Sequence, residues 1–428
     1  MIRKARLVRA FFFDREVSDR PRVQNFLTLI GLLFFLEGSL LGTPQASLVE
    51  IDAFLVDHYY DREFIEEVWP QTLKRARKRV AEASDETKGY KAIQEALNEF
   101  AHSHMAFYPP WNPWASVLSG RRGGWEMDFE LYLIEGALRV GFISEEGPSR
   151  KAGLRAGMKV LSIDGVESKE ILQRRAPLFE AYRLVDRCPW GKLDLIVEGR
   201  PHPKRRGDRL SIQLKKDTRA QSRFGHVAFP RDLKVKARSD GVLYAAFNAF
   251  TFDQVKEVKK AIQSHRGGRG VILDLRGNPG GVGALGPAIA LEFCAKAYSF
   301  GSMKGRDMNL RFPVFPQAKV HPGPVAILVD GRSLSTSEIT ARGMQLEGSA
   351  KIFGQRTPGM ALPSLILKLK DGSRFQYPVA DFQDESGVSL EGRGVEPDVE
   401  IPMTLKDVLE NRDPTLEGAL DWILEKEE

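Results

Sequence analysis

The chain has 428 residues, and its 42% hydrophobic content is enough for two or three globular domains with cores of their own. Residues 1–46 supply half of the formal net charge of +6, and the near-balanced remainder argues against a nucleic-acid partner. The two cysteines, Cys188 and Cys294, lack metal-site spacing; export would allow a disulfide between them, which nothing else in the sequence favours. Nothing in the composition indicates a metal or an organic cofactor.

Residues 1–46 have the features of an N-terminal targeting segment. Seven basic and four acidic residues accompany an apolar run of 11 residues, Phe26–Leu36, and small residues follow it. Such a run is too short to cross a membrane comfortably and suits the apolar part of a secretory signal. We therefore expect export to the periplasm or another extracytoplasmic space. A retained anchor, giving membrane association through the N-terminus, a start codon placed too early and a buried helix are the alternatives.

Residues 47–120 are expected to form a helical domain. Apolar side chains recur at helical spacing between charged ones from Leu48 to Ala83, and a second helix is expected from about Lys88. One face of that second helix carries Ile93, Leu97, Phe100 and His104. A lone histidine on an apolar face is more often structural than catalytic. However, Ser103 and the turn after it place His104 at a helix end, where it is more accessible.

Residues 125–216 contain strand-like runs separated by turns. Within them, Ala152-Gly153-Leu154, then Gly157, then an apolar strand ending in Ile163-Asp164-Gly165 resemble the pattern of a PDZ domain. PDZ domains capture a peptide C-terminus as an added strand at a sheet edge, so the resemblance implies peptide recognition. A structural insert of the same shape without a ligand is the alternative.

A charged linker, Lys215–Arg238, leads to a predicted α/β domain over residues 235–402. The segment Val242–Phe247 is typical of a strand, Phe252–Ser264 of a helix and Gly270–Arg276 of a buried strand, which together predict βαβ units. The loop Gly277–Gly281 follows, and its glycines allow backbone N–H groups to converge on an anion. Asp274 and Arg276 are expected to pair and fix that loop. Residues 403–428 complete the chain as a helical segment.

The stretch from Gly331 to Met360 follows a buried strand, Val325–Val329, and leads into a helix, Ser337–Leu346. Three serines lie in the turn between them: Ser333, Ser335 and Ser337. Small hydroxyl residues are common at turns and helix N-caps, so this stretch alone favours a structural role.

Four ordered motifs change that interpretation: Asp274–Gly281, Ser333–Ile339, Gly354–Gly359 and Gly392–Asp398. With the PDZ-like segment and the helical lead, they resemble the C-terminal processing (tail-specific) serine proteases over nearly all of the chain beyond residue 47. The resemblance implies a crotonase-like α/β catalytic core with a PDZ domain inserted upstream, acting on proteins or peptides. It also implies that Ser335 is the nucleophile and that the N–H groups of Thr336 and Gly280 form the oxyanion hole.

The sequence departs from most of that family at Met360, which stands where the family has its lysine general base. A serine hydroxyl needs an adjacent base, and Lys368 and Lys370 alternate with apolar residues as on the solvent face of a strand. A branch typified by the tricorn core protease uses a histidine with an adjacent serine and a distant glutamate. The matching residues here are His104, Ser103 and Glu391.

The expected mechanism is acyl transfer, with His104 as general base about 3 to 4 Å from Ser335, and with Ser103 and Glu391 orienting the imidazole. His102 is a weaker rival. The main alternative function is a protease-like protein that has lost its base and only binds peptides. A core that binds an apolar small molecule rests on fold analogy alone. The sequence indicates no oligomeric state.

Overall fold

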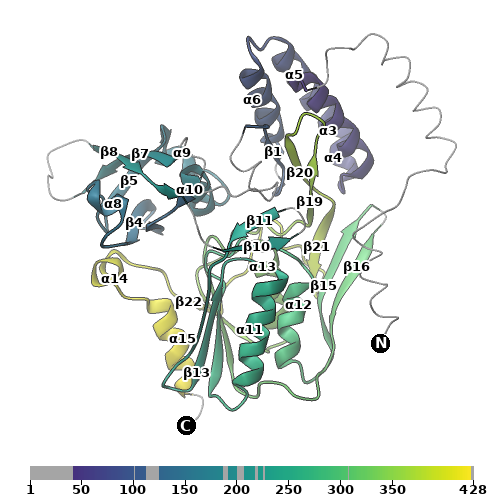
Figure 1. Ribbon diagram of the computed structural model, residues 1–428. Coiled ribbons are helices and arrows are strands. Elements are labelled where there is room, and N and C mark those ends of the chain that lie inside the picture. The colour runs from purple at the N-terminus through teal and green to yellow at the C-terminus, as the bar shows by residue number, and fades with distance from the viewer. Residues whose placement is uncertain are drawn as a thin grey trace.

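The computed structural model describes residues 42–425 apart from 101, 112–124, 187–190, 200–206, 217–219, 225–226 and 307. The predictions made for the N-terminal targeting segment up to residue 41 and for Cys188 therefore lie outside the described residues. Figure 1 shows three bodies: a helical domain, a strand-rich middle domain (residues 125–216) and a larger α/β domain.

The described part of the helical domain contains the helices α3 (Pro44–His58), α4 (Arg62–Glu67), α5 (Trp69–Ala81) and α6 (Glu86–Leu97). The N-cap side chains of Thr43, Asp61 and Asp85 each accept a backbone N–H, which fixes where α3, α4 and α6 begin. Among the described residues, no helix is both long and apolar enough to cross a membrane.

The prediction that one helix carries both Ile93 and His104 is wrong. Helix α6 ends at Leu97, and His104 has a φ of 60° in the turn before strand β1 (Ala106–Tyr108). A positive φ is incompatible with a right-handed helix, so His104 is presented by a turn. The apolar stripe itself holds as far as Phe100, which is buried in the helical domain.

A hairpin from far along the chain joins the helical domain to the α/β domain. Strand β1 pairs antiparallel with β20 (Arg374–Pro378), which pairs with β19 (Ser364–Lys368), and Ala106 lies opposite Gln376. The buried side chains of Phe107, Phe375 and Tyr377 belong to one core with those of α3, α5 and α6. The hairpin therefore fixes the turn that precedes β1, which carries His104.

The middle domain has its own hydrophobic core and a sheet in the order β3-β4-β5-β7-β8. Its strands are β2 (Trp125–Glu126), β3 (Phe129–Ile134), β4 (Ala137–Ile143), β5 (Lys159–Ile163), β6 (Val166–Glu167), β7 (Lys192–Glu198), β8 (Asp208–Gln213) and β9 (Lys215–Lys216). Its helices are α8 (Pro148–Lys151), α9 (Ser168–Leu172) and α10 (Pro177–Asp186).

A six-stranded sheet forms the centre of the α/β domain, in the order β12-β13-β14-β17-β18-β22. All neighbours are parallel except the outer pair β12 and β13. The strands are β12 (Leu233–Ala237), β13 (Val242–Phe247), β14 (Gly270–Asp274), β17 (Val325–Val329), β18 (Lys351–Gly354) and β22 (Val399–Glu400). This confirms the α/β class.

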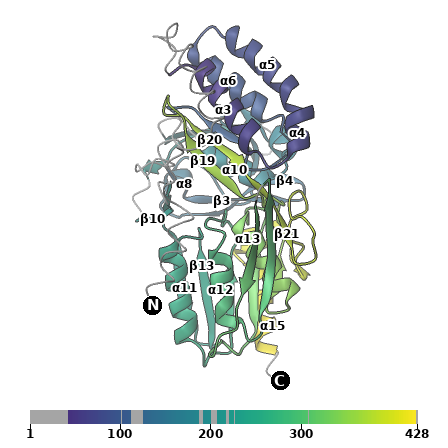
Figure 2. The same cartoon turned by 90° about the vertical axis from the view of Figure 1, so that its right-hand side faces the viewer.

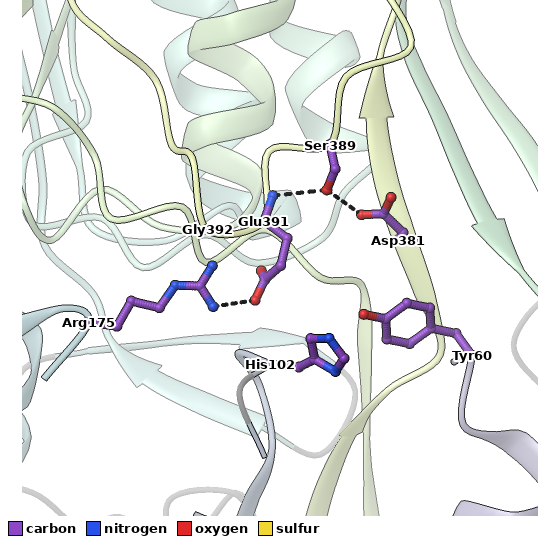
Figure 3. A pocket seen from close by; sticks show the side chains of 7 residues that line it. All are labelled: Tyr60, His102, Arg175, Asp381, Ser389, Glu391 and Gly392. Atoms are coloured by element: carbon purple, nitrogen blue, oxygen red, sulfur yellow. Dashed lines mark hydrogen bonds and ion pairs between the residues drawn. The ribbon is translucent and has the colours of Figure 1, made fainter. Parts of the chain in front are cut away.

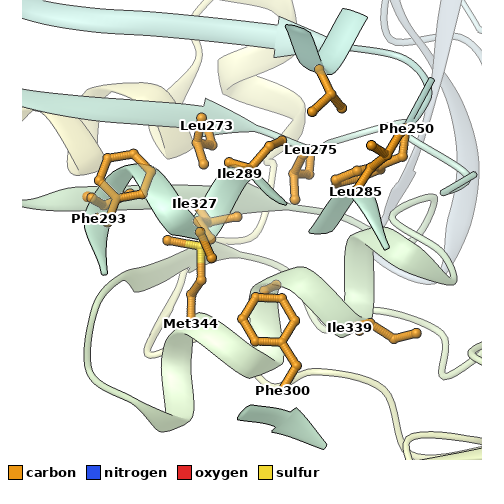
Figure 4. Close-up of a cluster of buried hydrophobic side chains, with 14 of the residues drawn as sticks. Phe250, Leu273, Leu275, Leu285, Ile289, Phe293, Phe300, Ile327, Ile339 and Met344 are labelled. Atoms are coloured by element: carbon orange, nitrogen blue, oxygen red, sulfur yellow. The ribbon is translucent and has the colours of Figure 1, made fainter. Parts of the chain in front are cut away.

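Two faces of this sheet are covered by different helices. Leu273 and Ile327 pack beneath α11 (Phe252–Ser264), α12 (Leu285–Ala290) and α13 (Thr336–Leu346), with a 3-10 turn η2 (Leu291–Phe293) after α12 (Figure 4). Ile272 and Leu328 pack on the opposite side against α15 (Pro414–Glu425). The alternation follows from the two-residue period of a strand. Helix α14 (Leu405–Glu410) precedes α15 and lies near the middle domain.

The expected linker Lys215–Arg238 is instead largely strand. It contains a hairpin, β10 (Gln221–Phe224) with β11 (Val227–Pro230), and the edge strand β12. Charged side chains such as Lys234 and Lys236 are common on edge strands, because they discourage pairing with other molecules. These charges made the sequence of β12 resemble a linker. A second sheet of the same domain, β16-β15-β21, contributes Phe300, Phe312 and Phe382 to its core, and Figure 2 shows β21 next to α13. Its strands are β15 (Tyr298–Gly305), β16 (Asn309–Val314) and β21 (Ala380–Asp384).

Candidate active site

Three loops meet where the parallel strands β14, β17 and β18 end. The first is the Gly-rich loop 275–281, the second is the serine turn 330–335 and the third is the segment 355–361 that contains Met360. The carboxyl ends of neighbouring parallel strands lie at one edge of a sheet, so these loops are close together although residues 282–329 separate the first from the second.

The three serines of the turn have different surroundings. Ser333 Oγ donates to the carbonyl of Leu275 at 2.8 Å, Ser337 Oγ donates to that of Asn278 at 2.8 Å, and both side chains are fully buried. Ser335 is partly exposed, and its Oγ faces the Glu338 N–H in a capping box, while within the described residues its hydroxyl proton is donated to no acceptor. Ser333 and Ser337 therefore fasten the turn to the Gly-rich loop, and Ser335 alone has a hydroxyl available for reaction.

Ser335 has an unusual backbone conformation, with φ 54° and ψ −117°, at the N-cap of α13. A non-glycine residue in this region carries strain of about 1–3 kcal/mol and persists only where its surroundings enforce it. Glu338 does so, because its buried carboxylate accepts the Ser335 N–H at 3.0 Å. A sharp turn from strand to helix exposes the nucleophile in other hydrolases for the same geometric reason.

Glu338 also holds the segment 355–361. Its carboxylate accepts Thr357 Oγ1 at 2.6 Å, the Gly359 N–H at 2.7 Å and the Met360 N–H at 2.9 Å. Burial raises the pKa of Glu338 to about 7, although these donors favour the charged form. Glu338 was part of the recognised motif, but the sequence did not show that it joins the serine turn to this segment.

The two expected oxyanion donors differ in availability. Gly280 lies against Ser335, since a Cβ placed on it would be 2.8 Å from Ser335 Cβ. Its N–H, however, donates to Asn278 Oδ1 at 2.9 Å. The Thr336 N–H, at the first position of α13, has no acceptor among the described residues, and helix N-termini favour negative charge. Thr336 is therefore the available donor in this state.

Ser103, His104 and Glu391 form one hydrogen-bonded chain. Ser103 Oγ lies 2.8 Å from both His104 Nδ1 and Glu391 Oε2, and the Ser103 N–H donates to Glu391 Oε1 at 2.8 Å. The Glu391 side chain is 288 residues from Ser103 in sequence, so the fold itself assembles the chain.

This chain determines the tautomer of His104. An ionised carboxylate only accepts hydrogen bonds, so the Ser103 hydroxyl proton points to Glu391 and Ser103 Oγ accepts the proton of His104 Nδ1. The lone pair of the neutral imidazole is then on Nε2. Desolvation lowers the pKa of His104 to about 4, with Glu391 opposing this shift and Arg175 adding to it. His104 is thus a neutral acceptor at ordinary pH.

Residues Met360 and Ala361 connect this chain to the serine turn. The Met360 carbonyl accepts the Ser335 N–H at 3.0 Å, and the Ala361 N–H donates to Glu391 Oε2 at 3.2 Å. Within the described residues no hydrogen bond joins Ser335 to His104, and the expected separation of about 3 to 4 Å remains a prediction. Lys368 and Lys370 are exposed, as expected of a solvent face.

Arg175, from the middle domain, reaches the same carboxylate. Its guanidinium donates to Glu391 Oε1 at 2.5 Å and to the carbonyl of Gly359 at 2.7 Å. Figure 3 shows this pair at a pocket of about 470 Å³. The pocket is lined by Tyr60, His102, Arg175, Asp381, Ser389, Glu391 and Gly392, which come from all three domains. Sequence reasoning missed Arg175, because no motif marks it and only the packing of the domains brings it here.

His102 does not join the Ser103–His104–Glu391 chain. Its Nδ1 lies 2.6 Å from the hydroxyl of Tyr59, and its Nε2 lies 3.9 Å from Asp61 Oδ2. In Figure 3 its ring faces the pocket beside Tyr60. Cys294 is a buried free thiol that donates to the carbonyl of Lys296 at 2.9 Å, and nothing places it near the site.

Comparison with known proteins finds a family profile, a relative of similar length and solved structures of the same fold. The profile of peptidase family S41 matches residues 241–401. The carboxyl-terminal-processing protease of Synechocystis sp. is 25% identical over 412 residues, which cover 93% of this chain and 92% of that protein.

Two solved structures show the same fold. The photosystem II D1 C-terminal processing protease has a TM-score of 0.56 at 20% identity, over 84% of this chain and 93% of that one. The tricorn protease has a TM-score of 0.50 at 17% identity, over 90% of this chain and 36% of that one. With the match to the family S41 profile and the relative that spans nearly the whole chain, the comparisons identify a serine-type peptidase similar to the carboxyl-terminal-processing proteases.

Proposed function

We propose that this peptidase cleaves peptide bonds by acyl transfer, with Ser335 as nucleophile and His104 as general base and acid. The observation that carries the proposal is the Glu391–Ser103–His104 chain, which leaves the lone pair of a neutral imidazole on Nε2. The family lysine is absent at Met360, and this histidine supplies the missing proton acceptor.

In the first step, the Ser335 hydroxyl proton passes to His104 Nε2 as Oγ attacks the substrate carbonyl. The imidazolium that forms is stabilised by Glu391 through Ser103. The negative charge that develops on the carbonyl oxygen is met by the Thr336 N–H, and by the Gly280 N–H once it turns from Asn278. His104 then gives its proton to the leaving amine, and water hydrolyses the acyl-enzyme by the same route.

Ser335 and His104 must approach before the first step. Catalytic hydrogen bonds are often long or misaligned without substrate and tighten in the complex. Both residues lie in turns held by hydrogen bonds that a substrate could change. Glu338 accepts the N–H of Ser335. Glu391 accepts the N–H of Ser103, next to His104, and is itself paired with Arg175. Substrate binding is therefore expected to complete the catalytic geometry.

We propose that the α/β domain is a crotonase-like core and that the middle domain, as a PDZ domain, recognises the C-termini of substrate proteins. The sequence pattern around Gly153, Gly157 and Gly165 supports the latter, as do the positive φ values of these three glycines. The Synechocystis relative is named for carboxyl-terminal processing, which is consistent with such substrates. Export, or anchoring through the N-terminus, is proposed from residues 1–46.

The rival function is a protein that binds peptides without cleaving them. Purified protein without residues 1–41 is incubated with carboxymethylated casein, and the fragments are identified by mass spectrometry. We expect cleavage that is abolished in Ser335→Ala and reduced at least about 10³-fold in His104→Ala. His58→Ala, which changes an exposed histidine of the same domain, is the matched control and should cleave normally. Binding of casein without cleavage by the unaltered protein supports the rival.

A further inference from the structure

A pocket of about 470 Å³ lies beside the Ser103–His104–Glu391 chain and has no part in the proposed mechanism. It lies at the junction of the three domains, and Glu391 belongs both to its lining and to the chain. Pockets of about 300–1,000 Å³ are typical of sites that bind small ligands. A group held in this pocket would therefore lie next to the carboxylate that supports the proposed base.

The carboxylate of Asp381, on strand β21, lines the pocket without a cation as its partner. Its Oδ1 accepts the hydroxyl proton of Ser389 at 2.7 Å, and its Oδ2 accepts the Gln383 amide at 3.2 Å. Lys304 lies opposite Asp381 on β15, but its side chain is exposed and, within the described residues, pairs with no carboxylate. Neutral donors leave the charge of a carboxylate uncompensated, and its remaining lone pairs can accept further hydrogen bonds.

The positive charge in the lining, that of Arg175, is already engaged. Its guanidinium donates to Glu391 Oε1 at 2.5 Å and to the carbonyl of Gly359 at 2.7 Å. The other basic side chain of the lining, His102, lies 3.9 Å from a further carboxylate, Asp61. An anionic ligand would have to break these contacts, whereas a cation would meet a carboxylate that has no ionic partner.

The hydroxyl of Tyr60 lies in the negative field of the same carboxylates. Burial raises its pKa, the charges of Glu391, Asp381 and Asp61 raise it further, and Arg175 opposes them. The hydroxyl therefore stays protonated and keeps lone pairs that can accept a hydrogen bond. In Figure 3 the hydroxyl end of Tyr60 points toward the middle of the group of lining residues.

We propose that this pocket is a specificity subsite that holds a positively charged side chain of the substrate, lysine or arginine. Asp381 is the counterion of that side chain, and the Tyr60 hydroxyl is a second acceptor. Because Glu391 and Gly392 line the same pocket, the basic residue lies beside the catalytic chain. The peptidase therefore selects substrates with lysine or arginine at a fixed distance from the cleaved bond. This inference rests on the proposed function, since it names the substrate class of the same site.

Peptide binding to Ser335→Ala protein tests the subsite without requiring cleavage. Synthetic 15-residue peptides that cover the casein sequence are screened, and each one that binds is made again with its lysines and arginines replaced by glutamine. The last three residues are left unchanged, so that recognition of the C-terminus by the middle domain is not altered. The replacement should weaken binding about tenfold, the effect of one hydrogen bond between charged groups.

The variant Ser335→Ala/Asp381→Asn should bind both peptides of a pair equally. Asparagine keeps an acceptor for Ser389 and removes only the charge. Asp421→Asn, which removes an exposed carboxylate on α15, is the matched control and should keep the tenfold difference. Equal binding of the paired peptides to Ser335→Ala, or a tenfold difference that persists in Asp381→Asn, would overturn the proposal.

Cleavage by the active enzyme gives a second measurement. In fragments of carboxymethylated casein, lysine and arginine should be enriched at least about fivefold at one fixed position relative to the cleaved bonds, and Asp381→Asn should abolish this enrichment. Absence of enrichment with the unaltered enzyme contradicts the proposal even if Asp381→Asn does not fold. If the unaltered enzyme cleaves nothing, the proposed mechanism fails, and peptide binding still decides the subsite.

Discussion

At the scale of single residues, the three serines of the turn differ: two have structural roles, and the third is the proposed nucleophile. Ser333 and Ser337 donate their hydroxyl protons to the Gly-rich loop, whereas within the described residues Ser335 donates its own to no acceptor. We predict that Ser333→Ala and Ser337→Ala each lower the free energy of unfolding by about 1–3 kcal/mol, because each leaves a buried carbonyl with one donor fewer. Chemical denaturation measures this. Both variants should still be labelled by a fluorophosphonate, and loss of labelling in a folded variant would argue against this division.

The pKa of His104 leads to a prediction about pH. Because burial lowers this pKa to about 4, the imidazole stays neutral well below the 6.5 of a free histidine, and the acid limb of kcat/KM should lie near pH 4. Arg175 lowers this pKa and Glu391 raises it, so Arg175→Met should move the limb to higher pH and Glu391→Gln to lower pH. Shifts of the same sign in both variants would show that another group controls the limb.

Glu338 is predicted to be a positioning residue. A glutamine has one carbonyl oxygen in place of two carboxylate oxygens, and its amide would present N–H groups to the N–H groups that the carboxylate now accepts. Glu338→Gln should therefore lower kcat about 10²-fold while the KM changes little. The conservative control Glu347→Gln, on the exposed end of α13, should leave both constants unchanged. If kcat is unchanged in Glu338→Gln, contacts other than those of Glu338 hold Ser335, and the prediction is wrong.

The sequence could predict which residues are candidates for the active site. It could not predict the hydrogen bonds that distinguish one candidate from another. Ser335 was chosen by resemblance, and its free hydroxyl appears only when the partners of Ser333 and Ser337 are known. The Gly280 N–H could not be predicted to point at Asn278, since that depends on a local turn of the loop. Arg175 carries no motif and reaches Glu391 only through domain packing.

At the scale of elements, the β19–β20 hairpin positions His104, the proposed base. It pairs with β1 directly after His104 and contributes Phe375 and Tyr377 to the core of the helical domain. Phe375→Ala should destabilise the protein by about 3–5 kcal/mol, because it leaves a cavity in a closed core. It should also lower kcat by displacing the turn that holds His104.

Leu365→Ala is the matched control for this prediction. Leu365 lies on the same hairpin but is 49% exposed, so its truncation should change the free energy of unfolding by no more than about 0.5 kcal/mol. Thermal unfolding of both variants, followed with casein cleavage, makes the comparison. Equal stability of the two would mean that the hairpin does not contribute to the core as its burial indicates.

Elements with continuous apolar runs were predicted well, and elements formed by distant pairing were not. The buried strands β13 and β17 and helix α11 have the expected bounds, because local composition and period determine them. The helix expected to reach His104 ends at Leu97, since the pairing of β1 with β20 imposes an extended chain that local pattern does not reveal. For the same reason β12 was taken for part of a linker.

At the scale of the whole molecule, the site exists only where three bodies meet. The helical domain supplies Ser103 and His104, the α/β domain supplies Ser335 and Glu391, and the middle domain supplies Arg175. The sequence pointed to Ser103, His104, Ser335 and Glu391 as candidates and missed Arg175, whose contact across the domain junction is visible only in the fold. The arrangement suits a peptidase whose activity depends on how its domains are positioned.

The central claim is that Ser335 acts as nucleophile with His104 as its base, and active-site labelling tests it most directly. The purified protein is treated with a fluorophosphonate, and the modified residue and the labelling rate are determined by mass spectrometry. We predict one adduct per chain on Ser335, no adduct in Ser335→Ala and labelling slowed at least about 10³-fold in His104→Ala. An adduct that persists in Ser335→Ala, equal labelling in His104→Ala, or no adduct on the unaltered protein would contradict the account.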